Sequence, residues 1–378
     1  VIRSKRSNEN PAAAGLTSIW RTFPVYEVEV YCSIPFPVTG CLTRITSNAD
    51  GGTNKQMCTI WIKQTAPLLQ MILDYAQIDP LLLPALDNFP SLDIDRESLP
   101  AIREVLSQMP AKPKPEGLIE AKEVIRTETE NIDVYTYRKS DRADQPAVVW
   151  IHGGGYLFGS AEDDRAMQIA MRCDCTVFSV DYRLAPEYPF PAGSEDCYNT
   201  LKWLMNGQSS YDIDLNRVAL GGASAGGGMA AGVALMNRDR DNFPLALQLL
   251  IYPMIDNLHA TPSGEFENHP VWNQATSHNA WEMYLDGKPG ERASPYAAAA
   301  RAKDLGGLPP AYICVGTADL FRDEDIAYAN RLTEAGIATE LAVFPGVYHA
   351  AEGFIPEAPV SQRMTQSFMT ALNDALTV

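Results

Sequence analysis

The sequence has no apolar run near the roughly 20 residues that a membrane-spanning helix needs. Positive charge is also scarce, because 30 Lys and Arg face 47 Asp and Glu, which gives a formal net charge of −17. Proteins that bind nucleic acid need clustered Lys and Arg on one surface. We therefore expect no membrane span and no nucleic-acid partner, and neutral or cationic partners are favoured.

The cysteines lack the spacing of a disulfide framework or of a zinc site. An odd number scattered over a long chain indicates a reducing compartment, so we expect a cytoplasmic protein. Cys173 and Cys175 form a C-x-C pair, but no His or second Cys pair lies at metal-ligand spacing, so no metal site is expected. The seven cysteines are Cys32, Cys41, Cys58, Cys173, Cys175, Cys197 and Cys314.

The length of 378 residues and the 46% apolar content are enough for one main domain with additions. Residues 1–56 contain no Met and more basic than acidic residues, and we interpret them as an N-terminal extension of unknown role. Whether they are native or an added leader stays open. Residues 57–110 show short helical patterns broken by prolines and predict a cap segment. The main domain is expected at 111–378, with a second cap insertion at about 256–308.

Apolar runs alternate with helical patterns through the main domain, after a predicted hairpin at 122–139. Continuous apolar strands separated by helices indicate a mostly parallel sheet that is covered by helices on both faces. The sequence thus predicts an α/β fold. The runs are 147–152, 175–182, 217–222, 246–253, 311–316 and 339–346, and the helical patterns are 162–172, 196–206, 225–238, 324–335 and 361–376.

The stretch GGASAGGG at 221–228 surrounds one serine with five glycines. An apolar run enters it and a helical pattern leaves it, and Gly222 to Gly226 match G-x-S-x-G, the nucleophile elbow. Glycines two residues before and after Ser224 remove side chains that would collide in so sharp a turn. We predict that Ser224 is a nucleophile at a helix N-terminus. A P-loop is excluded, because no Lys follows the glycines.

A serine nucleophile needs a base, and the chain has five histidines. His349 alone follows directly on a late predicted strand, where it can reach a serine at a strand end. His259, His269 and His278 lie in the irregular insertion and are expected at the surface or in the cap. His152 heads a glycine run and is expected to brace that loop.

The acid that orients the base is predicted at Asp319, three residues beyond the apolar run 311–316. Asp323 and Glu324 begin a helical pattern, where acidic side chains favour the exposed N–H groups of the first turn. Ser224, Asp319 and His349 follow one another in the chain order of an α/β hydrolase.

The sequence HGGG at 152–155 closes the first parallel strand with amides that no side chain covers. Such amides can hold a developing oxyanion. We predict an oxyanion hole made of the N–H groups of Gly153, Gly154 and Ala225, with Gly155 as an alternative to one of the first two.

Five motifs together resemble the hormone-sensitive-lipase-like esterases, family IV of the bacterial lipolytic enzymes: HGGG, DYRLAPEYPFPA, GASAGG, DLFRDE and HAAEGF. The resemblance spans about residues 57–378. It implies an α/β-hydrolase core under a helical cap and hydrolysis of short- to medium-chain carboxylic esters without a cofactor. It also implies Ser224 as nucleophile, Asp319 as acid and His349 as base, with a small-molecule ester as partner.

The motifs depart from the family pattern at Ala223, at the sequence after Asp319 and in the expanded HAAEGF, and these departures concern subfamily and substrate preference more than the triad. Within DYRLAPE, we expect Arg183 and Glu187 to brace the loop under the oxyanion glycines. A homodimer is also left open.

Three alternatives remain on the sequence alone. The same triad can cleave amides. A non-catalytic binding protein can share the fold. A dinucleotide-dependent oxidoreductase would use Gly153, Gly155 and Gly159 as its glycine loop and Asp181 as the ribose-binding acid.

Overall fold

The computed structural model describes residues 73–87, 93–108, 112–127, 130–265, 267–269, 271–287, 290 and 292–377. The predicted extension at 1–56 and the first part of the predicted cap segment lie outside these residues. The described residues all belong to one compact unit, Gln70–Val378.

An eight-stranded sheet with the order β1-β2-β4-β3-β5-β6-β7-β8 forms the centre of this unit. The hairpin strands β1 and β2 pair antiparallel, β2 pairs antiparallel with β4, and all later pairs are parallel. This confirms the predicted fold. The strands are β1 (Ile119–Arg126), β2 (Asn131–Arg138), β3 (Gln145–Ile151), β4 (Thr176–Asp181), β5 (Ile213–Ala223), β6 (Leu247–Ile251), β7 (Ala311–Gly316) and β8 (Thr339–Phe344).

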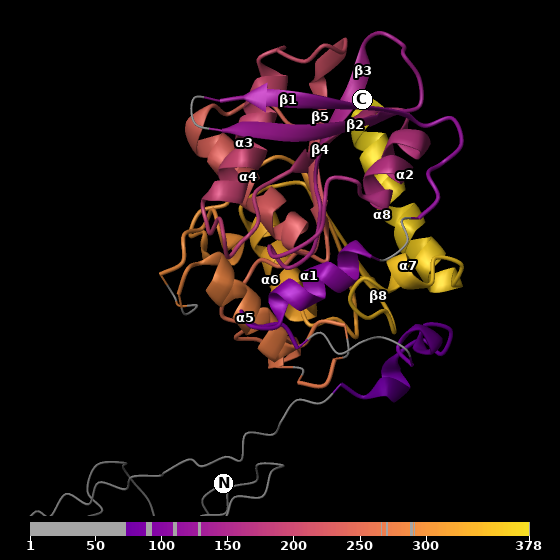
Figure 1. Ribbon diagram of the computed structural model, residues 1–378, viewed down its shortest axis with the longest axis vertical. Coiled ribbons are helices and arrows are strands. Elements are labelled where there is room, and N and C mark those ends of the chain that lie inside the picture. Colours follow the sequence, from indigo (N-terminus) through magenta and orange to yellow (C-terminus); the bar gives the residue numbers. More distant parts are fainter. Residues whose placement is uncertain are drawn as a thin grey trace, which may run out of the picture. The chain divides into compact units, whose positions relative to one another are not determined.

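Every residue of β3, β6 and β7 is buried, because helices cover both faces of the sheet. In Figure 1, α2 and α8 lie on one side of the strands and α3 and α4 on the other. The edge strand β1 is mostly exposed, and its Lys and Glu residues suit an unpaired edge. The core helices are α2 (Asp164–Cys173), α3 (Ala192–Met205), α4 (Ala225–Arg240), α6 (Arg322–Glu334), the short α7 (Ala351–Phe354) and α8 (Pro359–Thr377).

The two predicted cap regions contact each other. The Asn268 side chain accepts a hydrogen bond from Leu73 N at 2.7 Å and donates one to Leu73 O at 3.1 Å, while Asn279 donates to Ile94 O at 2.9 Å. Their helices are short: η1 (Tyr75–Gln77), η2 (Leu83–Ala85) and α1 (Leu99–Ser107) in the first region, and η3 (Ser263–Glu265), α5 (Gln274–Tyr284) and η4 (Ala299–Arg301) in the insertion.

The parallel strands β3, β5, β7 and β8 end at one edge of the sheet, so the loops that follow them lie together. The loops after β7 and β8 approach without room for a side chain, because a Cβ on Gly316 would lie 1.9 Å from Val347 O. Within the described residues, no helix has the length and hydropathy to cross a bilayer. The cysteines of that part, Cys173, Cys175, Cys197 and Cys314, are free and buried.

Candidate active site

Ser224 lies in the turn between β5 and α4 with a φ of +57°, a conformation that costs a non-glycine residue about 1–3 kcal/mol. The glycines on either side make this turn sterically feasible. A Cβ on Gly222 would lie 2.3 Å from Gly226 O, and one on Gly226 would lie 2.0 Å from Ile151 O. The Ser224 backbone also donates to Ile251 O at 2.9 Å. The predicted elbow is therefore present, and it is fixed against β3 and β6.

His349 connects Ser224 to Asp319 by two hydrogen bonds. Its Nε2 lies 2.9 Å from Ser224 Oγ, and its Nδ1 lies 2.9 Å from Asp319 Oδ2. All three residues are buried. The other oxygen of Asp319 accepts a hydrogen bond from Phe321 N at 3.0 Å, which fixes the carboxylate, and the Phe321 ring meets the imidazole edge-on at 5.0 Å. The fold thus brings the three predicted residues together from the ends of β5, β7 and β8.

The glycine loop after β3 runs directly beside the serine. A Cβ on Gly153 would lie 2.9 Å from Ala223 O and 3.4 Å from Ser224 Cβ. Gly154 and Gly155 have φ values of +119° and +59°, which side-chain-bearing residues rarely adopt. The loop therefore needs its glycines, and its backbone is close to the serine.

This loop does not have the open form of a dinucleotide site. A Cβ on Gly155 would lie 2.2 Å from the Trp272 ring, and one on Gly159 would lie 2.5 Å from His152 Nδ1. Side chains of the protein already occupy the space that these two glycines leave. The structure therefore does not support the alternative of a dinucleotide-dependent oxidoreductase.

Aromatic residues hold the glycine loop against the insertion. The Tyr156 hydroxyl donates to Met254 O at 2.8 Å, and its ring stacks on Tyr284 of α5 at 3.9 Å. Phe158 contacts Trp272 edge-on at 6.5 Å. The sequence gives no local signal for the contact between Trp272 and Gly155, because it joins distant parts of the chain.

Arg103 of α1 braces the glycine loop from the first cap region. Its guanidinium donates to Leu157 O at 2.8 Å and to Ala185 O at 2.7 Å, and it pairs with Glu187 at 2.7 Å. The hydrogen bonds from Arg103 lower the pKa of the Glu187 carboxyl. Glu187 thus takes part in the bracing that was predicted for it, through a partner that the sequence did not indicate.

Arg183 has a different role from the predicted one. Its guanidinium pairs with Asp196 at 2.8 Å and with Glu130 at 2.7 Å, so it joins the segment after β4 to α3 and to the hairpin. None of its hydrogen bonds within the described residues reaches the glycine loop. Arg103, and not Arg183, makes the arginine contacts that brace this loop.

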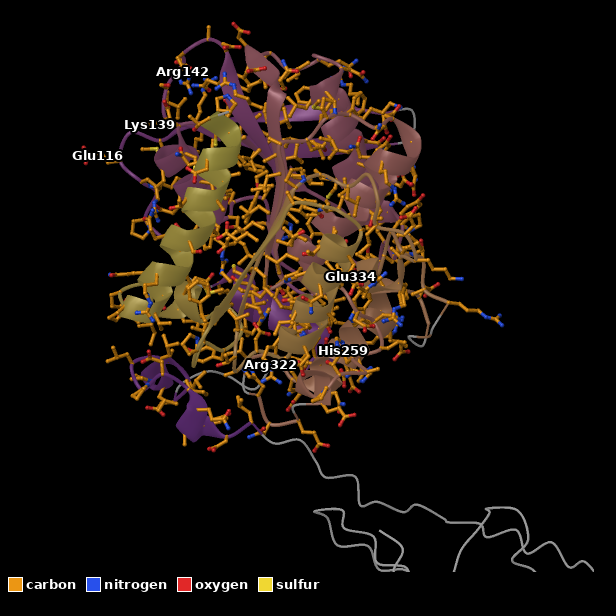
Figure 2. The ribbon with its side chains drawn as sticks, turned by 180° about the vertical axis from the view of Figure 1, so that it is seen from behind. Glu116, Lys139, Arg142, His259, Arg322 and Glu334 are labelled. Carbon is orange, nitrogen blue, oxygen red and sulfur yellow. The ribbon has the colours of Figure 1, made fainter. Side chains whose placement is uncertain are left out.

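His259 and His269 were expected at the surface or in the cap; both lie in the insertion, and both are buried, so a surface position is excluded. His259 Nε2 lies 2.8 Å from Ser277 Oγ and its Nδ1 lies 3.2 Å from Glu324 Oε2, which joins the insertion to α6. Figure 2 places His259 near Arg322, at the end of the fold opposite Lys139 and Arg142. Burial lowers the pKa of each of these two histidines to about 4, so both are neutral near pH 7.

The two remaining histidines are placed differently. His152 is buried, its ring stacks on Tyr182 at 4.2 Å, and its Nδ1 lies 2.8 Å from Gly153 O. Burial lowers its pKa, so the neutral ring donates to that carbonyl and braces the glycine loop as expected. His278 is half-buried beside His259.

A match to a known family follows from comparison with other proteins. The profile of the alpha/beta hydrolase fold family matches residues 148–352. Esterase LipI of Mycobacterium tuberculosis is 33% identical over 311 residues, which cover 79% of this chain and 95% of that protein. The chain belongs to this family of α/β hydrolases. The resemblance to hormone-sensitive-lipase-like esterases is confirmed, and so is the enzyme class that it implied, a carboxylesterase.

Other members of the family support the same conclusion. Carboxylesterase NlhH of Mycobacterium tuberculosis is 34% identical over 307 residues, which cover 79% of this chain and 96% of that protein. The solved structure of a bacterial heroin esterase superposes with a TM-score of 0.76 at 34% identity, covering 80% of this α/β hydrolase and 99% of that chain.

Two further acids of α6 are buried near the triad. Glu324 accepts hydrogen bonds from Ile255 N at 3.0 Å and Asp256 N at 3.1 Å. Neither carboxyl oxygen of Asp325 has a hydrogen-bond partner among the described residues. Burial, with smaller contributions from the charges of Glu324 and Asp319, raises the pKa of Asp325 well above its usual value. Ionising Asp325 in this place therefore opposes folding.

The cost of ionising Asp325 can be measured by replacing it with a neutral residue. When the pKa of a carboxyl is higher in the folded than in the unfolded protein, protonation of that carboxyl stabilises the fold. This contribution to stability is complete below the unfolded pKa, about 3.9 for Asp, and is lost as the pH rises through the folded pKa. Asp325→Asn cannot ionise, so it should unfold at least about 2 °C above the parent at pH 8, with the gain shrinking toward pH 4. Thermal unfolding across pH measures this.

The exposed carboxyl of Asp374 on α8 provides the control, because Asp374→Asn should change the unfolding temperature little at any pH. A loss of stability in Asp325→Asn that is the same at every pH would contradict the account of Asp325.

Proposed function

We propose that this carboxylesterase hydrolyses short- to medium-chain acyl esters through a Ser224–His349–Asp319 triad and an acyl-enzyme intermediate. The observation that carries the proposal is the pair of 2.9 Å contacts that link Ser224 Oγ, His349 and Asp319. A serine hydroxyl alone is a weak nucleophile, and a base oriented by a carboxylate is what activates it.

In the first half-reaction, Ser224 Oγ attacks the ester carbonyl carbon while His349 Nε2 takes the hydroxyl proton. Asp319 accepts a hydrogen bond from Nδ1–H, so it fixes the tautomer and stabilises the cation that forms. The N–H groups of Gly153, Gly154 and Ala225 hold the negative oxygen of the tetrahedral intermediate. Removing one such donor typically costs about 10²–10³ in kcat.

Collapse of the intermediate breaks the bond to the leaving oxygen, which takes the proton from His349 and departs as the alcohol. The acyl group stays on Ser224 Oγ. A water molecule then attacks the acyl carbonyl while His349 takes its proton; the bond from the acyl carbon to Ser224 Oγ breaks, His349 returns the proton to Oγ, and the acid is released.

The names of the relatives favour esters over amides, because LipI, NlhH and the bacterial heroin esterase are each called esterases or carboxylesterases. An amide would need the same triad with a protonated leaving amine. No contact at the site favours that alternative.

The bulky side chains around the glycine loop support a preference for substrates with a short acyl chain. Trp272 is buried against Gly155, Phe158 contacts its ring, and hydrogen bonds from Asn268 and Asn279 close the two cap regions on each other. An enclosed pocket limits the number of methylene groups that it can hold.

The acyl-chain preference is tested with p-nitrophenyl esters from acetate to palmitate. We expect kcat/KM to be highest for acyl chains of a few carbons and to fall about tenfold or more for the longest. Trp272→Ala should move the optimum toward longer chains, because it removes a ring beside the loop. Trp203→Ala, which removes a ring that packs on Phe178 instead, should leave the optimum unchanged. Preference of the parent for palmitate would contradict the proposal.

The acid is tested by comparing Asp319, in the loop after β7, with Asp323, in the first turn of α6. Asp319→Asn keeps the shape but misorients His349 and leaves its cation unsupported, so kcat should fall by about 10⁴. Asp323 instead accepts from Ser263 N at 2.9 Å and pairs with Arg322 at 2.6 Å. Asp323→Asn should keep kcat within about tenfold and lower the unfolding temperature slightly.

Both variants are measured at saturating substrate, with thermal unfolding in parallel. A larger loss of kcat in Asp323→Asn than in Asp319→Asn would show that Asp319 is not the acid.

A further inference from the structure

A cluster of two buried side chains, Tyr252 and Glu352, and the partly exposed Arg165 lies behind His349 and has no part in the mechanism above. Tyr252 follows β6, Glu352 belongs to α7 and Arg165 belongs to α2. The Tyr252 hydroxyl donates to Glu352 Oε1 at 2.6 Å, and Arg165 Nη2 donates to the Tyr252 hydroxyl oxygen at 2.6 Å and to Glu352 Oε1 at 2.7 Å. The Glu352 side chain is 4% exposed, and that of Arg165 is 26% exposed.

The tyrosine ring connects this cluster to the catalytic base. The rings of Tyr252 and His349 meet edge-on at a centroid distance of 4.9 Å. Phe321 makes the second edge-on contact with the imidazole, at 5.0 Å. The imidazole therefore has one aromatic neighbour held only by packing and another whose hydroxyl is fixed by an ion pair.

The backbone at Tyr252 is also constrained. Its φ is +36°, which is uncommon for a residue with a bulky side chain and costs free energy that the surroundings must offset. Tyr252 N donates to Cys314 O of β7 at 2.7 Å. Tyr252 is thus held at both ends, by the sheet through its amide and by Arg165 and Glu352 through its hydroxyl.

We infer that Arg165, Glu352 and Tyr252 form a positioning unit that holds the imidazole of His349 in line with Ser224 and Asp319. The inference rests on the proposed function. During turnover His349 must pass one proton from Ser224 Oγ to the leaving oxygen, and a displacement of about 1 Å can cost about 10² in rate. None of the three residues touches the reacting atoms, so they act through the imidazole alone.

The unit also carries two opposite charges, and their balance changes the free energy of protonating the His349 imidazole. Glu352→Gln leaves the Arg165 cation uncompensated, which disfavours a second cation nearby. Arg165→Gln leaves the Glu352 anion uncompensated, which favours a protonated imidazole nearby. The acidic limb of the kcat/KM profile reports protonation of the base. It should move to lower pH in Glu352→Gln and to higher pH in Arg165→Gln, by about 0.5 pH units each.

The other titratable groups around His349 are the same in both variants. Asp319 faces it from the loop after β7 and the neutral His269 from the insertion, while the hydroxyl of the preceding residue, Tyr348, is uncharged near pH 7. Opposite shifts in the two variants therefore come from the unit itself.

Matched controls exist for each change. Tyr312→Phe removes another buried hydroxyl, which donates to Ser367 Oγ at 2.7 Å. Asp214→Asn breaks the 2.5 Å pair with Arg217 near the start of β5, at the end of that strand far from Ser224. Arg165→Lys keeps the charge and restores part of the contact, so it tests rescue.

The experiment measures kcat and KM with a short p-nitrophenyl ester from pH 5 to pH 9, with thermal unfolding of each variant. We expect Tyr252→Phe to lower kcat about tenfold with little change in KM, because the ring stays and only its anchor is lost. Glu352→Gln and Arg165→Gln should give the opposite shifts, Arg165→Lys should remove most of the shift, and both controls should change stability alone.

The inference is overturned when the folded variants Tyr252→Phe, Glu352→Gln and Arg165→Gln show the kcat and pH profile of the controls. Poor folding of Glu352→Gln would leave Tyr252→Phe and the two Arg165 variants to decide. Failure of the proposed function looks different, since the parent enzyme itself would then lack hydrolysis that depends on Ser224.

Discussion

The close approach of α4 to the end of β3 is the constraint on which the site depends. A Cβ on Gly226 would lie 2.0 Å from Ile151 O and 2.4 Å from His152 O, so only a glycine lets the first turn of the helix reach this strand. That approach places Ser224 beside Gly153 and fixes its strained backbone. A side chain at Gly226 would move the helix away and separate the serine from the amides of the glycine loop.

Much of this arrangement could be predicted from the sequence, because it depends on local rules. Continuous apolar runs separated by helical patterns predicted the parallel sheet, and parallel strands end at a common edge. Residues directly after such strands can therefore meet, which is why Ser224, Asp319 and His349 could be chosen without coordinates. Gly222 and Gly226 predicted the nucleophile elbow for the same reason, because their spacing follows from the geometry of one turn.

The parts that the sequence missed depend on contacts between distant segments. His259 and His269 were expected at the surface or in the cap because the insertion is irregular, yet both are buried, and His259 contacts Glu324, which lies 65 residues away. Arg103 reaches Ala185 across 82 residues, and Arg165 reaches Glu352 across 187. No local pattern marks such pairs, because their energy comes from tertiary burial and not from the propensity of either segment.

The proposed mechanism requires that Ser224 forms the covalent intermediate. A fluorophosphonate probe reacts with an activated serine hydroxyl, and peptide mapping of the labelled enzyme identifies the residue that carries it. The account predicts one adduct per chain, on Ser224, which is lost in Ser224→Ala and strongly slowed in Asp319→Asn. An adduct on another serine, or an unlabelled enzyme that still hydrolyses esters, would contradict it.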